Sequence, residues 1–164
     1  YSMRGKTHAH RKLQDDVPEE IKQIRLQEVI NTFRTQVQSR NEEIEVGRLR
    51  LVLMEGESKK FNIDSPTWSG RTDQNKRIVF PSMELGCFDD GIVSSILAGG
   101  TVLDFPQVPI TKGDYVVVHV TESRGHTLRG KIAWRTSLSK FDEMNLTMDN
   151  ETALKDALGL HAIT

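Results

Sequence analysis

The sequence predicts a mainly β protein: a small closed β-barrel preceded by one long helix. Residues 19–46 contain no Gly or Pro and carry apolar residues at helical spacing, which favours a helix. After Gly47 the apolar residues alternate with polar ones in short runs that are separated by turn residues. Several short strands in succession are typical of a small barrel, and a chain of 164 residues is long enough to bury a core.

A connecting helix is expected over residues 15–44, with the clearest signal in residues 15–39. Asp15 or Asp16 is expected to cap its start. Its apolar residues form two stripes, because successive side chains turn by about 100°. The stripes are Val17, Ile21 and Ile24 on one face, and Leu26, Val29, Ile30, Phe33 and Val37 on nearly the opposite face. Two stripes need two packing partners, so we expect one stripe to be exposed in this chain. Burial of both stripes within one domain is the alternative.

Strands are expected at residues 49–53, 59–63, 68–71, 77–80, 115–121 and 127–134. Alternation places these side chains inward: Val116, Val118, Val120, Leu128, Ile132 and Trp134. Gly130 is expected to mark a bend or a bulge. Residues 81–112 are too long and irregular for an ordinary connection, which indicates an insertion with a small element at 92–97. Residues 141–164 are expected to form a short helix that is capped by Asn150 and stopped by Gly159, or to be disordered.

Composition excludes several classes of protein. No stretch approaches the roughly 18 consecutive apolar residues that a membrane-spanning helix needs, so no membrane partner is expected. The single cysteine, Cys87, excludes an internal disulfide, a cysteine-rich zinc site and a self-contained iron–sulfur cluster, and it suits an intracellular setting. The net charge of -1 hides a basic middle, with 13 basic and 10 acidic residues between positions 48 and 140, and an acidic end. This uneven charge is a weak indication of an anionic partner.

The sequence contains no pattern that is specific for catalysis. It has no phosphate-binding glycine loop, no histidine pair at metal-binding helical spacing and no nucleophile elbow. His8 and His10 share one side of a possible strand, and they are expected to be solvated or to face phosphate. His119 is expected at the surface, and Cys87 as an inert thiol.

The stronger signal is a set of cationic side chains that strand alternation directs outward. We expect them to contact phosphates or bases of an RNA. The set is Arg50, Arg71, Lys76, Arg77, Arg129, Lys131 and Arg135. Trp68 and Tyr115 could stack on bases if they are exposed. The alternative is that these Lys and Arg residues only keep the strands soluble.

Particular blocks of the sequence resemble a known family. Residues 1–7 (YSMRGKT) and 16–22 (DVPEEIK), with Arg25 and Leu26, resemble the end of the radical-SAM barrel in tRNA methylthiotransferases. The blocks that resemble the family's C-terminal TRAM domain, a small OB-like β-barrel, are 46–47 (VG), 52–56 (VLMEG), 70–75 (GRTDQN), 79–80 (VF), 113–114 (GD) and 128–130 (LRG). Lys6 stands where the family usually has a glycine, a variant similar to the eukaryotic organellar branch.

This resemblance implies a division of the chain. Residues 1–14 would be a remnant of the α/β radical-SAM barrel and 15–44 the connecting helix. Residues 46–136 would be the TRAM barrel, with an insertion at 82–108 that has no assigned counterpart, and 137–164 an acidic tail. The chain would therefore be a C-terminal piece of the parent enzyme.

The resemblance also implies a function. The family adds a methylthio group to C2 of N6-isopentenyladenosine next to the tRNA anticodon, and it uses two 4Fe–4S clusters and S-adenosylmethionine. The cluster cysteines would lie upstream, so this piece is expected to hold no cofactor and to be inactive alone. Its expected partners are the tRNA anticodon stem-loop and the parent's catalytic radical-SAM barrel, in a mitochondrion or another organelle. A protein-interaction module, or a structural cap without RNA binding, is the alternative.

Overall fold

The structure is a computed structural model that describes residues 5–14, 16–58, 67–81, 88–100, 102, 106–144 and 146–160. The expected strand at 59–63 and the expectation for Cys87 lie outside the described residues. The first residues of the expected radical-SAM remnant and much of the expected insertion also lie outside them, so these two assignments stay predictions.

The centre of the molecule is a sheet of five strands, and the expectation of a small sheet-rich domain is confirmed, although the described residues hold more helices than the one long helix of the expected fold class. The strands are β1 (Leu49–Glu57), β2 (Thr67–Thr72), β3 (Arg77–Pro81), β4 (Tyr115–Arg124) and β5 (Thr127–Thr136). They pair in the order β1-β2-β3-β5-β4, and β4 pairs back onto β1, so the sheet closes on itself. All pairs are antiparallel except that between β3 and β5.

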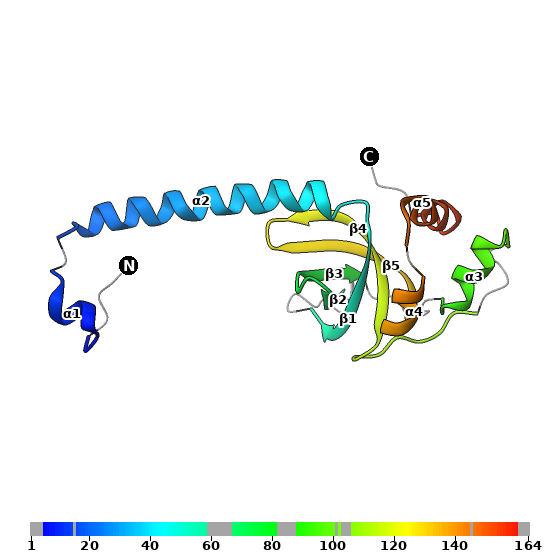
Figure 1. Ribbon diagram of the computed structural model, residues 1–164. Helices are drawn as coiled ribbons and strands as arrows, with labels where there is room; N and C mark the ends of the chain where they lie inside the picture. Colours follow the sequence, from blue (N-terminus) through cyan, green and yellow to red (C-terminus); the bar gives the residue numbers. More distant parts are fainter. Residues whose placement is uncertain are drawn as a thin grey trace.

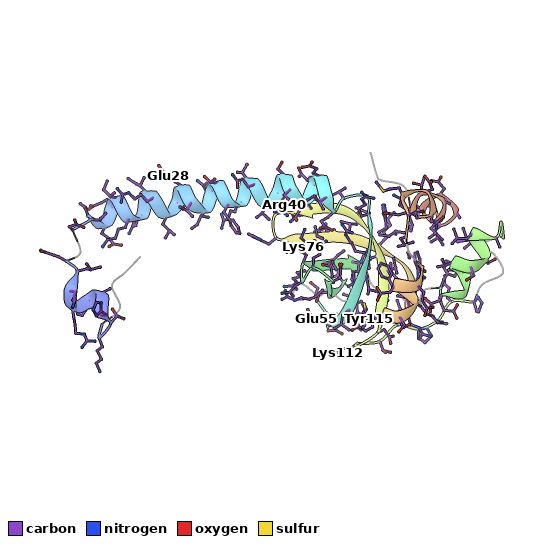
Figure 2. All side chains as sticks on the ribbon, viewed as in Figure 1. Glu28, Arg40, Glu55, Lys76, Lys112 and Tyr115 are labelled. Carbon is purple, nitrogen blue, oxygen red and sulfur yellow. The ribbon has the colours of Figure 1, made fainter. Side chains whose placement is uncertain are left out.

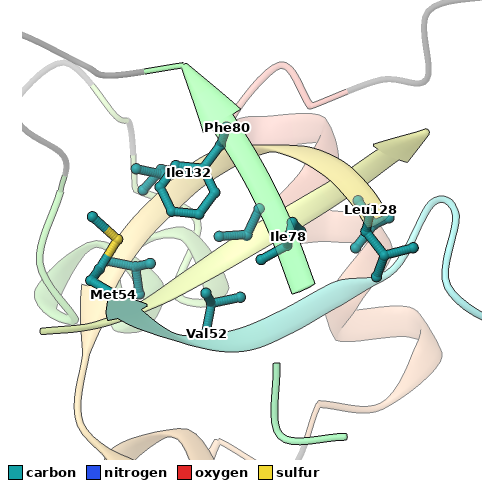
Figure 3. Packing of buried hydrophobic residues seen from close by; sticks show 9 residues of the cluster. Val52, Met54, Ile78, Phe80, Leu128 and Ile132 are labelled. Carbon is teal, nitrogen blue, oxygen red and sulfur yellow. The ribbon is translucent and has the colours of Figure 1, made fainter. Parts of the chain in front are cut away.

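The interior of this closed sheet is filled by one apolar cluster (Figure 3). Val116, Val118 and Val120 of β4 are fully buried in it, as the alternation predicted. The other buried members are Val52, Met54, Ile78, Phe80, Leu128 and Ile132. Alternation therefore predicted the inner face of β4 correctly, and that of β5 except at one position. On β1 the alternation of Leu49, Leu51 and Leu53 with Arg50 and Val52 predicted the wrong face, because Val52 and Met54 fill the interior and Leu53 is 38% exposed.

The exception on β5 is Trp134, which is fully buried but lies outside the barrel interior. The register shifts between the pairs Val117↔Trp134 and Val118↔Ile132, so β5 carries an extra residue at Ala133. Such a bulge moves the following side chains to the other face of a sheet. Trp134 consequently packs in a second core outside the barrel. The other register shift lies opposite Gly130, and its extra residue, Thr121, belongs to β4 rather than to β5.

The second core joins the barrel to helix α3 (Gly91–Leu97), which precedes β4, and to helix α5 (Met148–Ala157) near the C-terminal end of the chain (Figure 1). Helix α3 confirms the small element that was expected within the insertion. Helix α4 (Leu138–Glu143) leads to α5, which Thr147 caps in place of Asn150. The buried members of this core are Leu49, Ile92, Val93, Ile96, Val117, Ala133, Trp134, Leu154 and Leu160. The acidic end of the chain is thus docked on the barrel.

A polar contact also fixes α5 to the barrel. The buried Glu151 carboxylate accepts a hydrogen bond from the Leu49 backbone N–H at 2.8 Å, and Lys155 donates to the Gly47 carbonyl at 2.9 Å. His119 lies nearby and is 1% exposed, so the expectation of a surface histidine is wrong. Its position on β4 faces the second core, because Val117 and His119 are on the side of the strand that these helices cover.

Helix α2 (Glu19–Ile44) projects from the barrel as a long arm that ends in the short helix α1 (His8–Lys12) (Figure 1). It runs one turn beyond residue 39. Both stripes have exposed members: Ile21 and Ile24 are 40% and 54% exposed, and Val29 and Phe33 are 65% and 56% exposed. Exposure therefore affects both stripes, because most of α2 has no neighbour among the described residues. His8 and His10 lie in α1, and the strand expected there is wrong.

Candidate nucleic-acid interface

A groove of about 520 Å³ lies where α2, the β2–β3 turn and the β4–β5 turn meet. We call it the basic groove. Its lining is Val37, Arg40, Asn41, Arg71, Gln74, Asn75, Lys76, Arg77, His126 and Thr127. Four of these side chains are cationic and none is a carboxylate, so the groove is a favourable site for an anion. Figure 2 shows Arg40 on α2 close to Lys76 at the edge of the barrel.

The roof of the basic groove is held in place by hydrogen bonds between α2 and the β4–β5 turn. Gln38 donates to the Ser123 carbonyl at 2.9 Å and also accepts from the Gly125 N–H. Asn41, which is 5% exposed, donates to the Gly125 carbonyl at 2.8 Å. Gly125 has a φ of +61°, a left-handed conformation that glycine adopts without strain. These contacts fix the cations on α2 relative to those on the barrel.

Two arginines lie side by side on the barrel surface that lines the basic groove. Arg71 on β2 and Arg77 on β3 are directly paired across the two strands, and Arg77 is paired in turn with Thr127 on β5. Like charges in this relation repel each other; Glu55 beside Arg71 offsets part of the repulsion, and an anion in the groove would offset more of it. Arg71 donates to Asn75 of the turn and lies 3.4 Å from Glu55, which holds its guanidinium in one place.

Lys76 is fixed by a buried carboxylate behind the groove. Glu45, at the end of α2, is 1% exposed and lies 2.6 Å from both Lys76 Nζ and Arg50 Nε. Burial by itself would raise the pKa of Glu45, but the hydrogen bonds from Lys76 and Arg50 outweigh it and lower the pKa below its usual value. Glu45 is therefore ionised, and it neutralises part of the charge of Lys76 and Arg50.

The seven predicted site residues are thus only partly brought together. Arg71, Lys76 and Arg77 line the basic groove, and Arg50 lies beside it through Glu45. Arg129 and Lys131 follow Thr127 along the outer face of β5, and Arg129 lies 3.8 Å from Glu122. RNA binding by these residues stays a prediction.

Arg50 and Arg135 are the exceptions in position. Arg50 is paired with Val118 of the interior cluster, so it lies on the inward side of β1, where it meets Glu45, and not on the expected outer face. The bulge at Ala133 pairs Arg135 with Val116, whose side chain points into the barrel, so Arg135 does not share the face of Arg129 and Lys131. Its guanidinium instead donates to the Pro109 carbonyl at 3.3 Å. The expected alignment of all three β5 cations on one face is therefore wrong.

The two aromatic side chains that were expected to stack on bases do not lie in the basic groove. Trp68 is partly buried and packs against the interior of the barrel. Tyr115 is half-buried and lies near Glu55 and Lys112, at the end of the barrel away from Arg40 (Figure 2). Neither presents a free ring to the basic groove.

Sequence reasoning missed Arg40 and His126. It sought outward cations only on strands, whereas Arg40 comes from α2 and His126 from the β4–β5 turn. The helical position of Arg40 carried no signal, because only the docking of α2 against the turn brings it over β3. Within the described residues, neither Arg40 nor Arg77 makes an ion pair.

A second groove, of about 730 Å³, lies on the other side of the β4–β5 turn, and we call it the outer groove. It shares His126 and Thr127 with the basic groove and adds Arg34 and Arg124. In the acidic tail, Glu151 pairs with Arg48 and Lys155, neither of which is one of the seven predicted residues.

The described residues contain no group of three or more His, Cys, Asp or Glu side chains that could hold a metal ion. The sequence as a whole has one cysteine, fewer than the several thiolates that hold an iron–sulfur cluster. Its residues therefore do not fit the clusters that the resemblance implies. No helix in the described part of the chain is both long and apolar enough to cross a membrane.

The chain is similar to curated proteins that are much longer. It is 40% identical over 138 residues to the mitochondrial tRNA methylthiotransferase CDK5RAP1 of Mus musculus, covering 84% of this chain and 21% of that protein. It is 38% identical over 141 residues to a CDK5RAP1-like protein of Oryza sativa, covering 86% and 21%. The tRNA-2-methylthio-N(6)-dimethylallyladenosine synthase of Amoebophilus asiaticus is 39% identical over 101 residues, covering 60% and 20%. The chain thus spans about a fifth of the length of these relatives. No family model matches it.

Proposed function

Because this chain is homologous to a part of the tRNA methylthiotransferases, we propose that it is the part that binds tRNA, and that the basic groove contacts the phosphates. The observation that carries this proposal is the convergence of four cations, one from α2 and three from the hairpin of β2 and β3, on one groove without a lining carboxylate. The chain as a whole has a net charge of -1, so this concentration of positive charge is a local feature.

The strand arrangement supports the same function. A closed five-stranded barrel with a parallel pair between its third and fifth strands is OB-like, and OB-folds commonly bind nucleic acids on an outer face. The basic groove lies on the outer face of β2 and β3, which an RNA can reach. We assign this barrel as the TRAM domain, within residues 46–136.

A more specific proposal concerns the RNA substrate and the activity of the parent enzyme. We propose that the RNA is a tRNA anticodon stem-loop and that the parent adds a methylthio group to C2 of N6-isopentenyladenosine next to the anticodon, in a mitochondrion. The 4Fe–4S clusters and S-adenosylmethionine would be held by another part of the parent. They would supply the radical and sulfur chemistry, while this chain would hold the tRNA in place.

A second candidate function is docking on the catalytic barrel of the same parent as a structural cap. It is favoured by the exposed apolar side chains of α2, among them Ile24, Leu26 and Val29, which are 54%, 51% and 65% exposed. Large apolar side chains that gather on one exposed helix indicate an interaction site. If this were the sole function, the isolated chain would bind no RNA.

The test is binding of a fluorescein-labelled anticodon stem-loop, measured by anisotropy at several salt concentrations. Arg40→Gln with Arg77→Gln removes two unpaired groove cations and should lower the slope of log K against log salt by about 1.4 to 1.8, since each phosphate contact contributes about 0.7 to 0.9. Lys112→Gln is the control, because Lys112 is an exposed cation at the other end of the barrel (Figure 2). If Lys112→Gln lowered the salt dependence of RNA binding as much as the double substitution at Arg40 and Arg77, the assignment of the basic groove would be contradicted.

A further inference from the structure

An exposed pair of rings lies between the two grooves. The Phe33 ring on α2 and the His126 ring in the β4–β5 turn have centroids 5.2 Å apart and planes tilted by 34°. Phe33 is 56% exposed, although it is one of the largest apolar side chains of the helix. The contact therefore leaves much of the Phe33 ring open to solvent.

The position of this ring pair is fixed from both sides. His126 follows Gly125, whose N–H and carbonyl are both bonded to side chains of α2, Gln38 and Asn41. Phe33 lies on the same helix, so the two rings belong to one hydrogen-bonded unit. A platform that is ordered before its ligand arrives costs little conformational entropy on binding.

Positive charge flanks the ring pair on two sides. His126 lines both grooves, so the rings lie at the boundary between them. Arg34 and Arg124 line the outer groove, and Arg40 and Arg77 line the basic groove. Two carboxylates offset part of the charge of the outer groove: Glu42 is among its lining residues, and Glu122 lies 2.6 Å from Arg124. No carboxylate pairs with Arg34 among the described residues. A strand of RNA that crosses the turn would meet cations before and after the rings.

We propose that Phe33 and His126 form a stacking platform for one unpaired RNA base, whose neighbouring phosphates enter the basic groove and the outer groove. This inference rests on the proposed function and adds to it the class of RNA, a single-stranded or loop segment rather than a duplex. Aromatic faces beside a cationic groove are the usual way in which proteins bind unpaired bases, because every base has a face that can stack. A protein segment would gain the apolar contact but not the neutralisation of the cations on both sides.

The test compares an unstructured RNA oligonucleotide with a blunt RNA duplex of the same length, both binding to the 164-residue chain. Phe33→Ala should weaken binding of the single strand about tenfold, the size of effect that loss of one stacked base produces. Binding of the duplex should change less than twofold. The salt dependence for the single strand should stay the same, since no phosphate contact is lost. Phe33→Trp should retain tight binding.

Val29→Ala is the matched control, because Val29 is 65% exposed on the same helix and one turn from Phe33. The proposal is overturned if Val29→Ala and Phe33→Ala weaken the single strand equally, if the duplex loses as much affinity as the single strand, or if Phe33→Trp binds no better than Phe33→Ala. If the unchanged chain binds neither RNA, the proposed function itself fails. If the unchanged chain binds the single strand and Phe33→Ala binds it equally well, only the stacking platform fails.

Discussion

Replacing Glu45 by Gln tests whether the buried carboxylate holds α2 and the basic groove together. The change keeps the size of the side chain and removes its charge. Glu45 is 1% exposed and lies 2.6 Å from both Arg50 Nε on β1 and Lys76 Nζ in the β2–β3 turn. Glu45→Gln would leave two cations beside a neutral amide that can accept only at its single oxygen.

The expected cost follows from the burial of the three partners. Removing one member of a fully buried ion pair costs about 3–5 kcal/mol, and an exposed pair contributes about 0–1 kcal/mol. The side chains of Arg50 and Lys76 are 22% and 25% exposed, so they can partly regain water when the carboxylate is gone. We therefore expect the free energy of unfolding to fall by about 2–3 kcal/mol.

The assay is urea unfolding of the unchanged chain and of Glu45→Gln, followed by circular dichroism. Glu122→Gln is the matched control, because Glu122 also faces two arginines but is 42% exposed. The difference in the free energy of unfolding between the unchanged chain and Glu45→Gln should have its full size above pH 4.5. It should shrink as pH falls through the folded pKa of Glu45. This sign follows because the folded pKa lies below the unfolded one. If Glu45→Gln lowered the free energy of unfolding no more than Glu122→Gln does, the reasoning would be refuted.

Other parts of the fold give further predictions. Leu154→Ala should lower the free energy of unfolding by about 2–5 kcal/mol in the same urea assay, because Leu154 is 0% exposed, whereas Leu138→Ala, at a 50% exposed position, should cost well under 1 kcal/mol. Burial is the main cause that lowers the pKa of His119, and the nearby charge of Lys155 adds to it. The neutral His119 side chain therefore stabilises the fold fully above pH 6.5, and this stabilisation is lost as pH falls. The melting temperature of His119→Gln should accordingly fall less than that of the unchanged chain between pH 7 and pH 5, and equal falls would count against this role of His119. Arg129→Glu with Lys131→Glu should weaken binding of the anticodon stem-loop and reduce its salt dependence, and an unchanged affinity would remove the outer face of β5 from the interface.

Local patterns predicted the elements that depend on local chemistry. The alternation of Val116, Val118 and Val120 placed them in the interior, where each is fully buried. The polar turn between β2 and β3 is also present, with Asn75 in the left-handed conformation at φ +60°. These features follow from the period of the strand and from residue types that turns tolerate, so they can be predicted without knowledge of distant contacts.

Features that depend on packing between distant segments were not predictable. A bulge at Ala133 leaves no local signature, yet it moved Trp134 into the second core and Arg135 off the face of Arg129. The surface position expected for His119 was wrong for a related reason, because helices far along the chain cover its side of β4. Arg40 joined the candidate site only because α2 docks on the β4–β5 turn.

The central claim is that RNA occupies the basic groove. Its most direct test is to map backbone amide chemical shifts of the chain during titration with an anticodon stem-loop. The account predicts that the changes gather at residues 34–41, 71–77 and 125–127. Changes that gather instead around Glu55, Lys112 and Tyr115, at the other end of the barrel, would contradict it (Figure 2).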